Sequence, residues 1–257
     1  MASSQLKSTI EGEPDRPVLL LANSLAATSA MWDEQRSAWL ARWRILQFDY
    51  AGHGDPEADS SGAPATVDGI ANVVLALLDA IGVQRFCFVG LSLGGMLGLR
   101  LAALTPGRLE RLVVANCRYH QTPVLEQQWT DRIEAVRAGG MDAIAGPTVE
   151  RWLTEPYRQR RPDQAAKIGA MIRSTSPSGY AAAAAAARDF DARPWLQRIR
   201  CPVLVISGAQ DAAAPRDHLD ILAVQLRADH TVLDPCAHLS CIEQADAFTQ
   251  GAGKFLA

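Results

Sequence analysis

One serine lies in a setting that suits nucleophilic catalysis. Gly90-Leu91-Ser92-Leu93-Gly94 follows the apolar run at 85–89 and precedes a helical pattern at 93–104. A G-x-S-x-G sequence between a strand and a helix is typical of a sharp turn that holds the serine hydroxyl above a sheet. The helix N-terminus favours negative charge developing there. We therefore expect Ser92 to be a nucleophile in acyl transfer; the alternative is an idle serine in a glycine-rich turn.

A serine hydroxyl becomes a strong nucleophile only when a base takes its proton. His238 is the best placed of five histidines, because it lies in the loop after the short strand pattern at 231–233. His53 follows another strand and is expected to shape a loop near the site. His120 is the remaining alternative, at the entrance of an inserted segment. We expect His238 to be the base.

The imidazole needs an acid that orients it and stabilises its charged form. Asp211 follows the apolar run at 202–207, again at the carboxyl end of a predicted strand. Asp217 lies on a predicted helix, and Asp234 ends a strand just before the histidine loop. We expect Asp211 to be the acid, with a helix-capping carboxylate as the alternative. The order Ser92, Asp211, His238 is one of the known arrangements of a catalytic triad.

Acyl transfer also needs N–H groups that bind the oxyanion. The backbone N–H of Leu93, directly after the nucleophile, is one expected donor. The second is expected in the loop Asn23-Ser24-Leu25-Ala26, which follows the apolar run at 18–22. We assign it to the backbone N–H of Leu25 on position alone.

The elements that must position these residues alternate along the chain. Strands are expected at 18–22, 44–49, 85–89, 109–115, 202–207 and 231–233, and helices at 67–81, 93–104, 216–226 and 242–256. Short β-branched runs that alternate with helices indicate βαβ units. We therefore predict an α/β fold, a mainly parallel sheet with helices on both faces.

One region lacks strands. Between residues 118 and 190 helical patterns appear at 127–137, 141–153, 162–172 and 178–188. The last contains an alanine-rich run, and alanine is the best helix former. We expect this segment to be a helical cap, with residues 1–117 and 191–257 forming the core.

Composition narrows the class of protein. Hydrophobic residues make up 48% of the 257 residues and charged residues 21%, which is typical of a folded globular chain rather than a disordered one. The net charge is −3 and no basic run suggests a nucleic acid partner. No stretch is long and apolar enough to cross a membrane, and the N-terminus lacks the pattern of a signal peptide. Five widely spaced cysteines favour neither disulfides nor a zinc site, so we expect a reduced, cytoplasmic protein.

With these residues placed, the chain resembles the α/β-hydrolase superfamily with a helical cap, and within it the 3-oxoadipate enol-lactonases of bacterial aromatic catabolism. The stretches that carry the resemblance are 20–25 (LLANSL), 31–33 (MWD), 52–54 (GHG), 90–96 (GLSLGGM), 132–141 (RIEAVRAGGM), 237–240 (AHLS) and 243–249 (EQADAFT). The asparagine-serine-leucine loop and the cap stretches narrow the match to the lactonase branch.

The resemblance implies an activity. A small enol-lactone of the β-ketoadipate pathway would be opened to a keto acid through an acyl-enzyme on Ser92, without a metal or other cofactor. It also implies that Trp152 forms part of the pocket wall, because this residue matches a tryptophan in the lactonase cap.

Two positions depart from the lactonase pattern. Ala51 replaces an arginine that often precedes the Gly-His-Gly stretch, and the segment 117–121 differs in sequence and length. If either position holds the carboxylate of an oxoadipate-type lactone, its recognition is altered here. Arg118 and His120 are the expected substitutes, and acyl specificity is expected to differ from the family type.

Other functions are compatible with the same candidate residues. A general carboxylesterase or lactonase and a cofactor-free perhydrolase use the same triad, so the triad does not distinguish among them. A receptor-like pocket without turnover is the non-enzymatic alternative, since a fold alone does not establish a function. A dehalogenase is disfavoured, because Ser92 stands where that chemistry needs a carboxylate. The expected partner is a small lactone or ester, with the oligomeric state open.

Overall fold

The computed structural model describes residues 6–257, so part of the N-terminal stretch that we searched for a signal peptide lies outside the described residues. Seven strands form one sheet in the order β1-β3-β2-β4-β5-β6-β7. They are β1 (Lys7–Glu11), β2 (Val18–Ala22), β3 (Arg44–Asp49), β4 (Phe86–Leu91), β5 (Leu109–Ala115), β6 (Val203–Gly208) and β7 (Asp229–Leu233). All neighbouring pairs are parallel except β1 and β3. The predicted α/β fold is confirmed.

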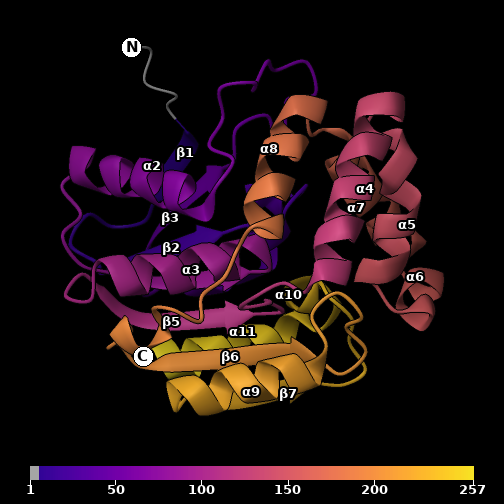
Figure 1. Ribbon diagram of the computed structural model, residues 1–257. Helices are drawn as coiled ribbons and strands as arrows, with labels where there is room; N and C mark the ends of the chain where they lie inside the picture. The colour runs from indigo at the N-terminus through magenta and orange to yellow at the C-terminus, as the bar shows by residue number, and fades with distance from the viewer. Residues whose placement is uncertain (1–5) are drawn as a thin grey trace.

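Helices cover both faces of this sheet. The helices packed on one face are α2 (Val67–Ala80), α3 (Leu93–Leu104) and α9 (Arg216–Leu226), which lie in front of the sheet in Figure 1. On the other face α1 (Asp33–Trp39) packs against α11 (Ala245–Leu256), with the short α10 (Ser240–Glu243) beside them. The five inner strands, β2 to β6, are almost fully buried, as expected for a parallel sheet covered on both sides.

The observed strands and helices agree closely with those predicted from the sequence, with four exceptions. The segments 7–11 (β1), 33–39 (α1) and 155–160 (α6) were not expected to be regular, and the predicted helix at 242–256 is two helices, α10 and α11. β1 has an exposed burial pattern because it is an edge strand. Strand prediction from apolar runs therefore does not detect it.

The segment 118–190 is helical, as predicted. It contains α4 (Pro123–Gly139), α5 (Asp142–Trp152), α6 (Glu155–Arg160), α7 (Pro162–Arg173) and α8 (Pro177–Arg188). Its two ends lie side by side, since an isolated β-bridge joins His120 to Asp191 and the N–H of Ala192 donates to the carbonyl of Tyr119 at 2.8 Å. Figure 1 shows α4, α5, α6 and α7 together on one side of the sheet. Its role as a cap stays a prediction.

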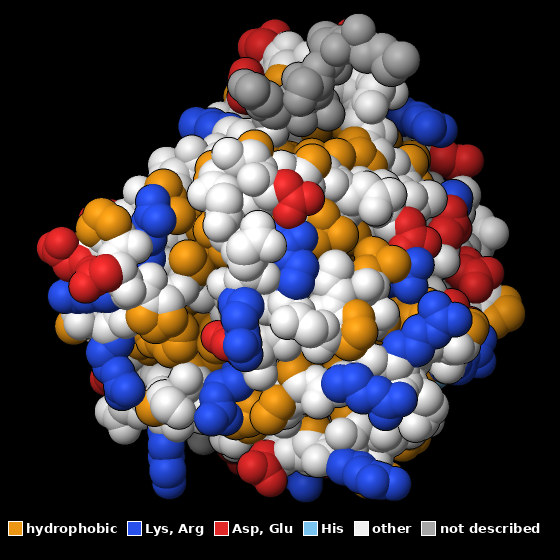
Figure 2. All heavy atoms as spheres, turned by 90° about the vertical axis from the view of Figure 1, so that its left-hand side faces the viewer, with side chains coloured by type: hydrophobic (Ala, Val, Ile, Leu, Met, Phe, Trp, Pro, Cys, Tyr) orange, Lys and Arg blue, Asp and Glu red, His pale blue; other side chains and the backbone are white. Residues whose placement is uncertain are grey.

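The surface carries side chains of mixed type, and the cysteines form no disulfide bond. On the face in Figure 2, basic and acidic side chains are interspersed with apolar ones. Within residues 6–257, no helix has the length and apolarity that a membrane span requires. All five cysteines are free thiols, and only Cys201 is partly exposed.

Candidate active site

The turn around Ser92 has the strained geometry expected from its sequence. β4 ends at Leu91, α3 begins at Leu93, and Ser92 between them has a φ of 59°, in the left-handed region that non-glycine residues seldom adopt. The Ser92 N–H donates to the carbonyl of Ala115 on the neighbouring β5 at 2.9 Å. Strain of this kind persists where the surrounding structure holds it, and it is common at active sites.

The two glycines of the motif are required by close backbone contacts. A Cβ on Gly90 would lie 2.2 Å from the carbonyl oxygen of Gly94, and a Cβ on Gly94 would lie 2.1 Å from that of Ala22. The Gly94 N–H donates to the carbonyl of Asn23 at 3.0 Å. The nucleophile turn is thus packed directly against the end of β2.

His238 and Asp211 form a buried pair. His238 Nδ1 lies 2.8 Å from Asp211 Oδ2, and their side chains are 5% and 0% exposed. Asp211 follows β6 and His238 follows β7, so the parallel arrangement of these strands brings the two loops to the same sheet edge. With the carboxylate accepting from Nδ1–H, Nε2 of the neutral ring is an acceptor, the form a general base requires.

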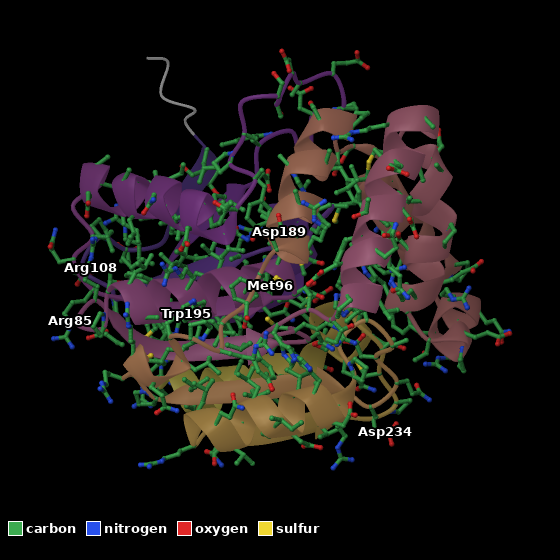
Figure 3. The ribbon with its side chains drawn as sticks, in the orientation of Figure 1. Arg85, Met96, Arg108, Asp189, Trp195 and Asp234 are labelled. Atoms are coloured by element: carbon green, nitrogen blue, oxygen red, sulfur yellow. The ribbon has the colours of Figure 1, made fainter. Side chains whose placement is uncertain are left out.

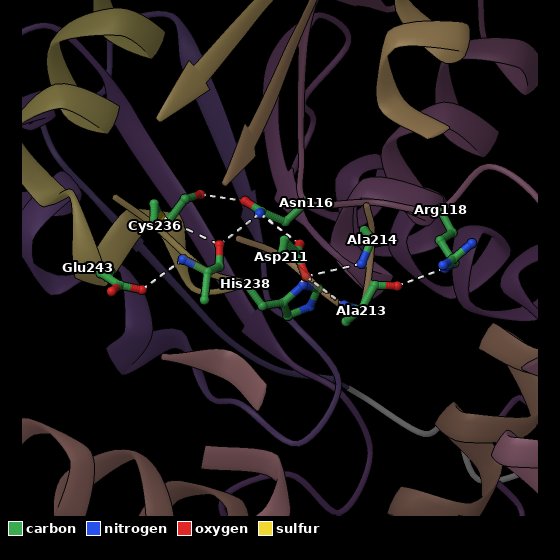
Figure 4. Close-up of polar contacts among 10 residues, drawn as sticks. Asn116, Arg118, Asp211, Ala213, Ala214, Cys236, His238 and Glu243 are labelled. Atoms are coloured by element: carbon green, nitrogen blue, oxygen red, sulfur yellow. Dashed lines mark hydrogen bonds and ion pairs between the residues drawn. The ribbon is translucent and has the colours of Figure 1, made fainter. Parts of the chain in front are cut away.

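Further donors stabilise the Asp211 carboxylate (Figure 4). Asn116 Nδ2 donates to Oδ2 at 2.9 Å, while the N–H groups of Ala213 and Ala214 donate to Oδ1 at 2.8 and 3.0 Å. Burial opposes ionisation of Asp211, yet the charge and hydrogen bond of His238, together with these donors, hold the pKa of Asp211 below its ordinary value. Asp211 is therefore an anion at neutral pH.

The histidine loop is bound to the helical segment. The N–H groups of His238 and Leu239 both donate to the carbonyl of Trp152, each at 3.1 Å. The Trp152 ring stacks on the His238 ring with centroids 6.0 Å apart and an interplanar angle of 30°. Glu243 accepts from the N–H of Ala237 at 2.9 Å and from that of Thr154 at 3.2 Å, so one carboxylate joins the loop to the start of α6. The orientation of His238 depends on α5 as well as on the sheet.

The loop expected to hold the second oxyanion donor is fixed by His53. His53 Nε2 accepts from the N–H of Ala26 at 3.0 Å, and Nδ1 lies 3.2 Å from the carbonyl of Ala51. Burial lowers the pKa of His53 to about 4, so the ring is neutral at pH 7 and can accept. His53 shapes this loop, as expected. Within residues 6–257, neither the N–H of Leu25 nor that of Leu93 has a hydrogen-bond partner, which leaves both free to bind an oxyanion.

These parts surround one cavity of about 130 Å³ between the sheet edge and the helical segment. Ser92, His238 and Leu25 line it together. Met96 of α3 is also in its wall, and Figure 3 shows this side chain between the sheet and the helices of the inserted segment. In the part of the chain that the structure describes, no hydrogen bond joins Ser92 to His238, so that contact stays a prediction.

The structure brings two of the three expected substrate-contacting residues to the cavity. Arg118 and Trp152 line it, and Arg118 Nε donates to the carbonyl of Ala213 at 2.7 Å. His120 does not line this cavity; its ring stacks on His218 with centroids 4.9 Å apart. The bridge to Asp191 holds the His120 backbone at the base of the helical segment, away from the cavity wall.

Sequence reasoning missed several polar residues of the cavity. Ser24, Arg132, Arg151 and Tyr180 all line it, and the Ser24 hydroxyl is buried without a partner among the described residues. Ser24 stands beside the assigned oxyanion donor, so its position already pointed to the site. Arg132, Arg151 and Tyr180 lie on three different helices. Arg132 begins the stretch 132–141 that carries the family resemblance, whereas nothing in the local sequence of Arg151 or Tyr180 distinguishes them from solvent-facing side chains.

Comparison with known proteins agrees with this geometry. Residues 17–245 match the family described as the alpha/beta hydrolase fold. The chain is 32% identical over 237 residues to 3-oxoadipate enol-lactonase 2 of Acinetobacter baylyi, covering 92% of this chain and 87% of that protein. It is 30% identical over 213 residues to a putative carbamate hydrolase RutD of Caulobacter sp. K31, covering 80% and 78%. The crystal structure of the enol-lactonase from Burkholderia xenovorans superposes with a TM-score of 0.92 at 35% identity, covering 98% of this chain and 96% of that one.

Proposed function

Since this chain belongs to the alpha/beta hydrolase fold family, we propose that it is a serine hydrolase that opens a small enol-lactone to a keto acid. Ser92 is the nucleophile, His238 the base and Asp211 the residue that orients the base, with the N–H groups of Leu25 and Leu93 binding the oxyanion. The observation that carries the proposal is the buried His238–Asp211 pair, whose histidine lines one cavity together with Ser92 of the strained turn.

The reaction follows from these positions. Ser92 Oγ forms a bond to the lactone carbonyl carbon while its proton passes to His238 Nε2. The ring C–O bond then breaks, and the enol oxygen leaves with the proton from His238. Water adds to the acyl carbon, gives a proton to His238, and displaces Ser92 Oγ, which regains that proton. The released enol becomes the keto acid by tautomerisation, and one water has been consumed.

Two relatives at similar identity support different substrates. The enol-lactonase of Acinetobacter baylyi supports the lactone, and the putative carbamate hydrolase supports a carbamate as the second candidate. Arg118 and Trp152 are proposed to contact the substrate in either case, because both line the cavity. We also propose that residues 118–190 act as the cap of a core formed by 1–117 and 191–257, in a cytoplasmic enzyme of aromatic catabolism.

The test is turnover of 3-oxoadipate enol-lactone by the wild type and by Ser92→Ala. The wild type is expected to release the keto acid, and the variant to retain the fold and lose nearly all activity, with only the contribution of binding and oxyanion donors remaining. A carbamate and an aryl ester measured in parallel separate the substrate classes. A wild-type protein that is not labelled by a fluorophosphonate, under conditions that label a control hydrolase, would instead favour a binding protein.

A further inference from the structure

Helix α8 contacts the loop that follows β3, residues 51–65. The N–H of Ser176, the N-cap of α8, donates to the carbonyl of Gly52 at 2.7 Å. Ser178 Oγ accepts from an N–H of the loop at 3.0 Å and donates to one of its carbonyls at 3.4 Å. Figure 1 shows α8 beside this loop. Among the described residues, the other hydrogen bond between the loop and a distant part of the chain comes from the N–H of Ala26. The loop therefore joins α8 to the segment that follows β2.

The contact between α8 and this loop is one of backbone against backbone. A Cβ on Gly179, in the first turn of α8, would lie 2.4 Å from the carbonyl oxygen of Ala51 and 2.9 Å from Cα of Gly52. Gly52 itself has a φ of 74°, in the left-handed region that favours glycine. Even one methyl group at position 179 must therefore displace the Ala51 carbonyl.

The same carbonyl sets the tautomer of His53. The Ala51 oxygen lies 3.2 Å from His53 Nδ1, and because a carbonyl can only accept, this nitrogen carries the ring proton. Nε2 is then an acceptor, and it binds the N–H of Ala26 at 3.0 Å. The position of the Ala51 carbonyl, which α8 contacts, thus determines whether His53 can hold the Ala26 N–H.

Ala26 directly follows Leu25, whose N–H is the assigned oxyanion donor. Ala26 has a φ of 60°, a conformation that non-glycine residues seldom adopt. The Ala27 N–H donates to the carbonyl of Ser24 at 3.1 Å, which closes a tight turn around Leu25. This turn and the bond to His53 fix the direction of the Leu25 N–H. Because an oxyanion donor acts only when it is aimed at the place where charge develops, a shift of this turn weakens transition-state binding.

We propose that Ser176 and Gly179, at the N-terminus of α8, are positioning residues for the oxyanion hole. They act through the Ala51 carbonyl and His53, so that a helix of the inserted segment helps to stabilise the transition state. The inference rests on the proposed hydrolase function and adds two residues to its machinery. Neither residue lines the Ser92 cavity, so the effect on catalysis is indirect.

The first test measures hydrolysis of 4-nitrophenyl acetate by Gly179→Ala. Complete loss of an oxyanion donor lowers kcat by about 10²–10³, and a displaced donor should cost less, about tenfold. Acylation and deacylation both pass through an oxyanion, so KM is expected to stay within about twofold of the wild type. Tyr180, next to Gly179, lines the cavity, so a general displacement of α8 would instead change KM.

A pair of inhibitors reports on the oxyanion hole directly. Ser92 Oγ adds to the carbonyl carbon of 1,1,1-trifluoro-2-butanone, its proton passes to His238, and the ketone oxygen becomes an oxyanion. The inhibition constant of this ketone is expected to rise about tenfold in Gly179→Ala, in parallel with the fall in kcat. Inhibition by 2-butanone, which binds without forming a stable adduct, is expected to be unchanged.

A double variant shows whether Gly179 acts through His53. His53→Phe removes the acceptor of the Ala26 N–H, and residues that act through one path have effects that are less than additive. The kcat of Gly179→Ala with His53→Phe is expected to lie within about threefold of either single variant, rather than at the product of the two losses.

Gly146→Ala is the matched control, because Gly146 lies on α5 of the same inserted segment and a Cβ there meets nothing within 4 Å. Its kcat and KM are expected to stay within about twofold of the wild type. Urea unfolding establishes that each variant is folded. If Gly179→Ala does not fold, Ser176→Ala replaces it, since Ser176 Oγ only caps the Gly179 N–H at 3.1 Å. Loss of this cap is expected to lower kcat about twofold to fivefold, again without a change in KM.

The outcomes separate this inference from the proposed function. If kcat is unchanged in the folded α8 variant, if only KM changes, or if the losses in the double variant multiply, the positioning role is wrong and the hydrolase assignment stands. If the α8 variant behaves as expected but the enol-lactone is not opened, the positioning role stands and the substrate assignment fails. Wild-type activity in Ser92→Ala would overturn the proposed function and the oxyanion hole with it.

Discussion

At the scale of single residues, Asp211 determines which ring nitrogen of His238 carries the proton. Replacing Asp211 with Asn puts an amide opposite His238 Nδ1, which favours the tautomer with the proton on Nε2. That ring cannot accept the Ser92 proton, so kcat for the aryl ester is expected to fall roughly 10⁴-fold. Asp217→Asn, at an exposed position on α9, is the control and is expected to retain wild-type activity. More than a tenth of the activity in Asp211→Asn would argue against the assigned triad.

His53 provides a second test at this scale. Because its Nε2 accepts from the Ala26 N–H, His53→Phe removes the bond that holds the loop carrying the Leu25 N–H. Losing an oxyanion donor outright lowers kcat by about 10²–10³. His53 acts only through the loop, so a smaller fall of roughly tenfold is expected in kcat, with little change in KM. A change confined to KM would show that the loop serves binding rather than the transition state.

At the scale of elements, the junction of β2, β4 and α3 is predicted to tolerate no added methyl group. Gly94→Ala would place a Cβ 2.1 Å from the Ala22 carbonyl oxygen, so backbone must move. We expect a loss of at least about 2 kcal/mol in the free energy of unfolding, measured by urea titration. Gly107→Ala is the control, because a Cβ there meets nothing within 4 Å, and its stability is expected to stay near the wild type.

The environment of each strand and helix also explains whether it could be predicted from the sequence. The strands at 18–22, 44–49 and 109–115 were predictable to the residue, because burial on both faces demands short segments in which most residues are apolar. β1 escaped notice because it is an exposed edge, and α1 and α6 because seven and six residues are too few to show a helical period.

The residues of the candidate site also fall into those that the sequence could predict and those that it could not. The serine, acid and histidine could be found because each follows a strand, and parallel strands bring their carboxyl ends to one edge. Arg132 and Arg151 could not, since the direction in which an arginine on an amphipathic helix points depends on how α4 and α5 pack over the sheet. Packing between helices is a tertiary property that local sequence does not determine.

At the scale of the whole molecule, two histidines couple folding to pH. Burial lowers the pKa of His53 to about 4, and burial and the charge of Arg118 lower that of His218 to about 4. In the unfolded chain both titrate near 6.5, so between pH 6.5 and 4 the unfolded state binds more protons than the folded state. Stability is therefore complete above about pH 6.5 and declines as the pH falls towards 4.

The decline in stability can be measured between pH 7 and pH 5, above the pH range in which the carboxylates titrate. His53 alone is expected to remove about 1.4 kcal/mol per pH unit near pH 5. Asp211 has a pKa below its ordinary value, so the stability it contributes is lost only at more acid pH, below the unfolded value of about 3.9. Urea unfolding at pH 7, 6 and 5 and constant ionic strength is expected to show a small loss in the first step and a larger loss in the second. A flat profile would mean that both rings take up protons in the folded protein, and that the Ala26 N–H lacks its acceptor in acid.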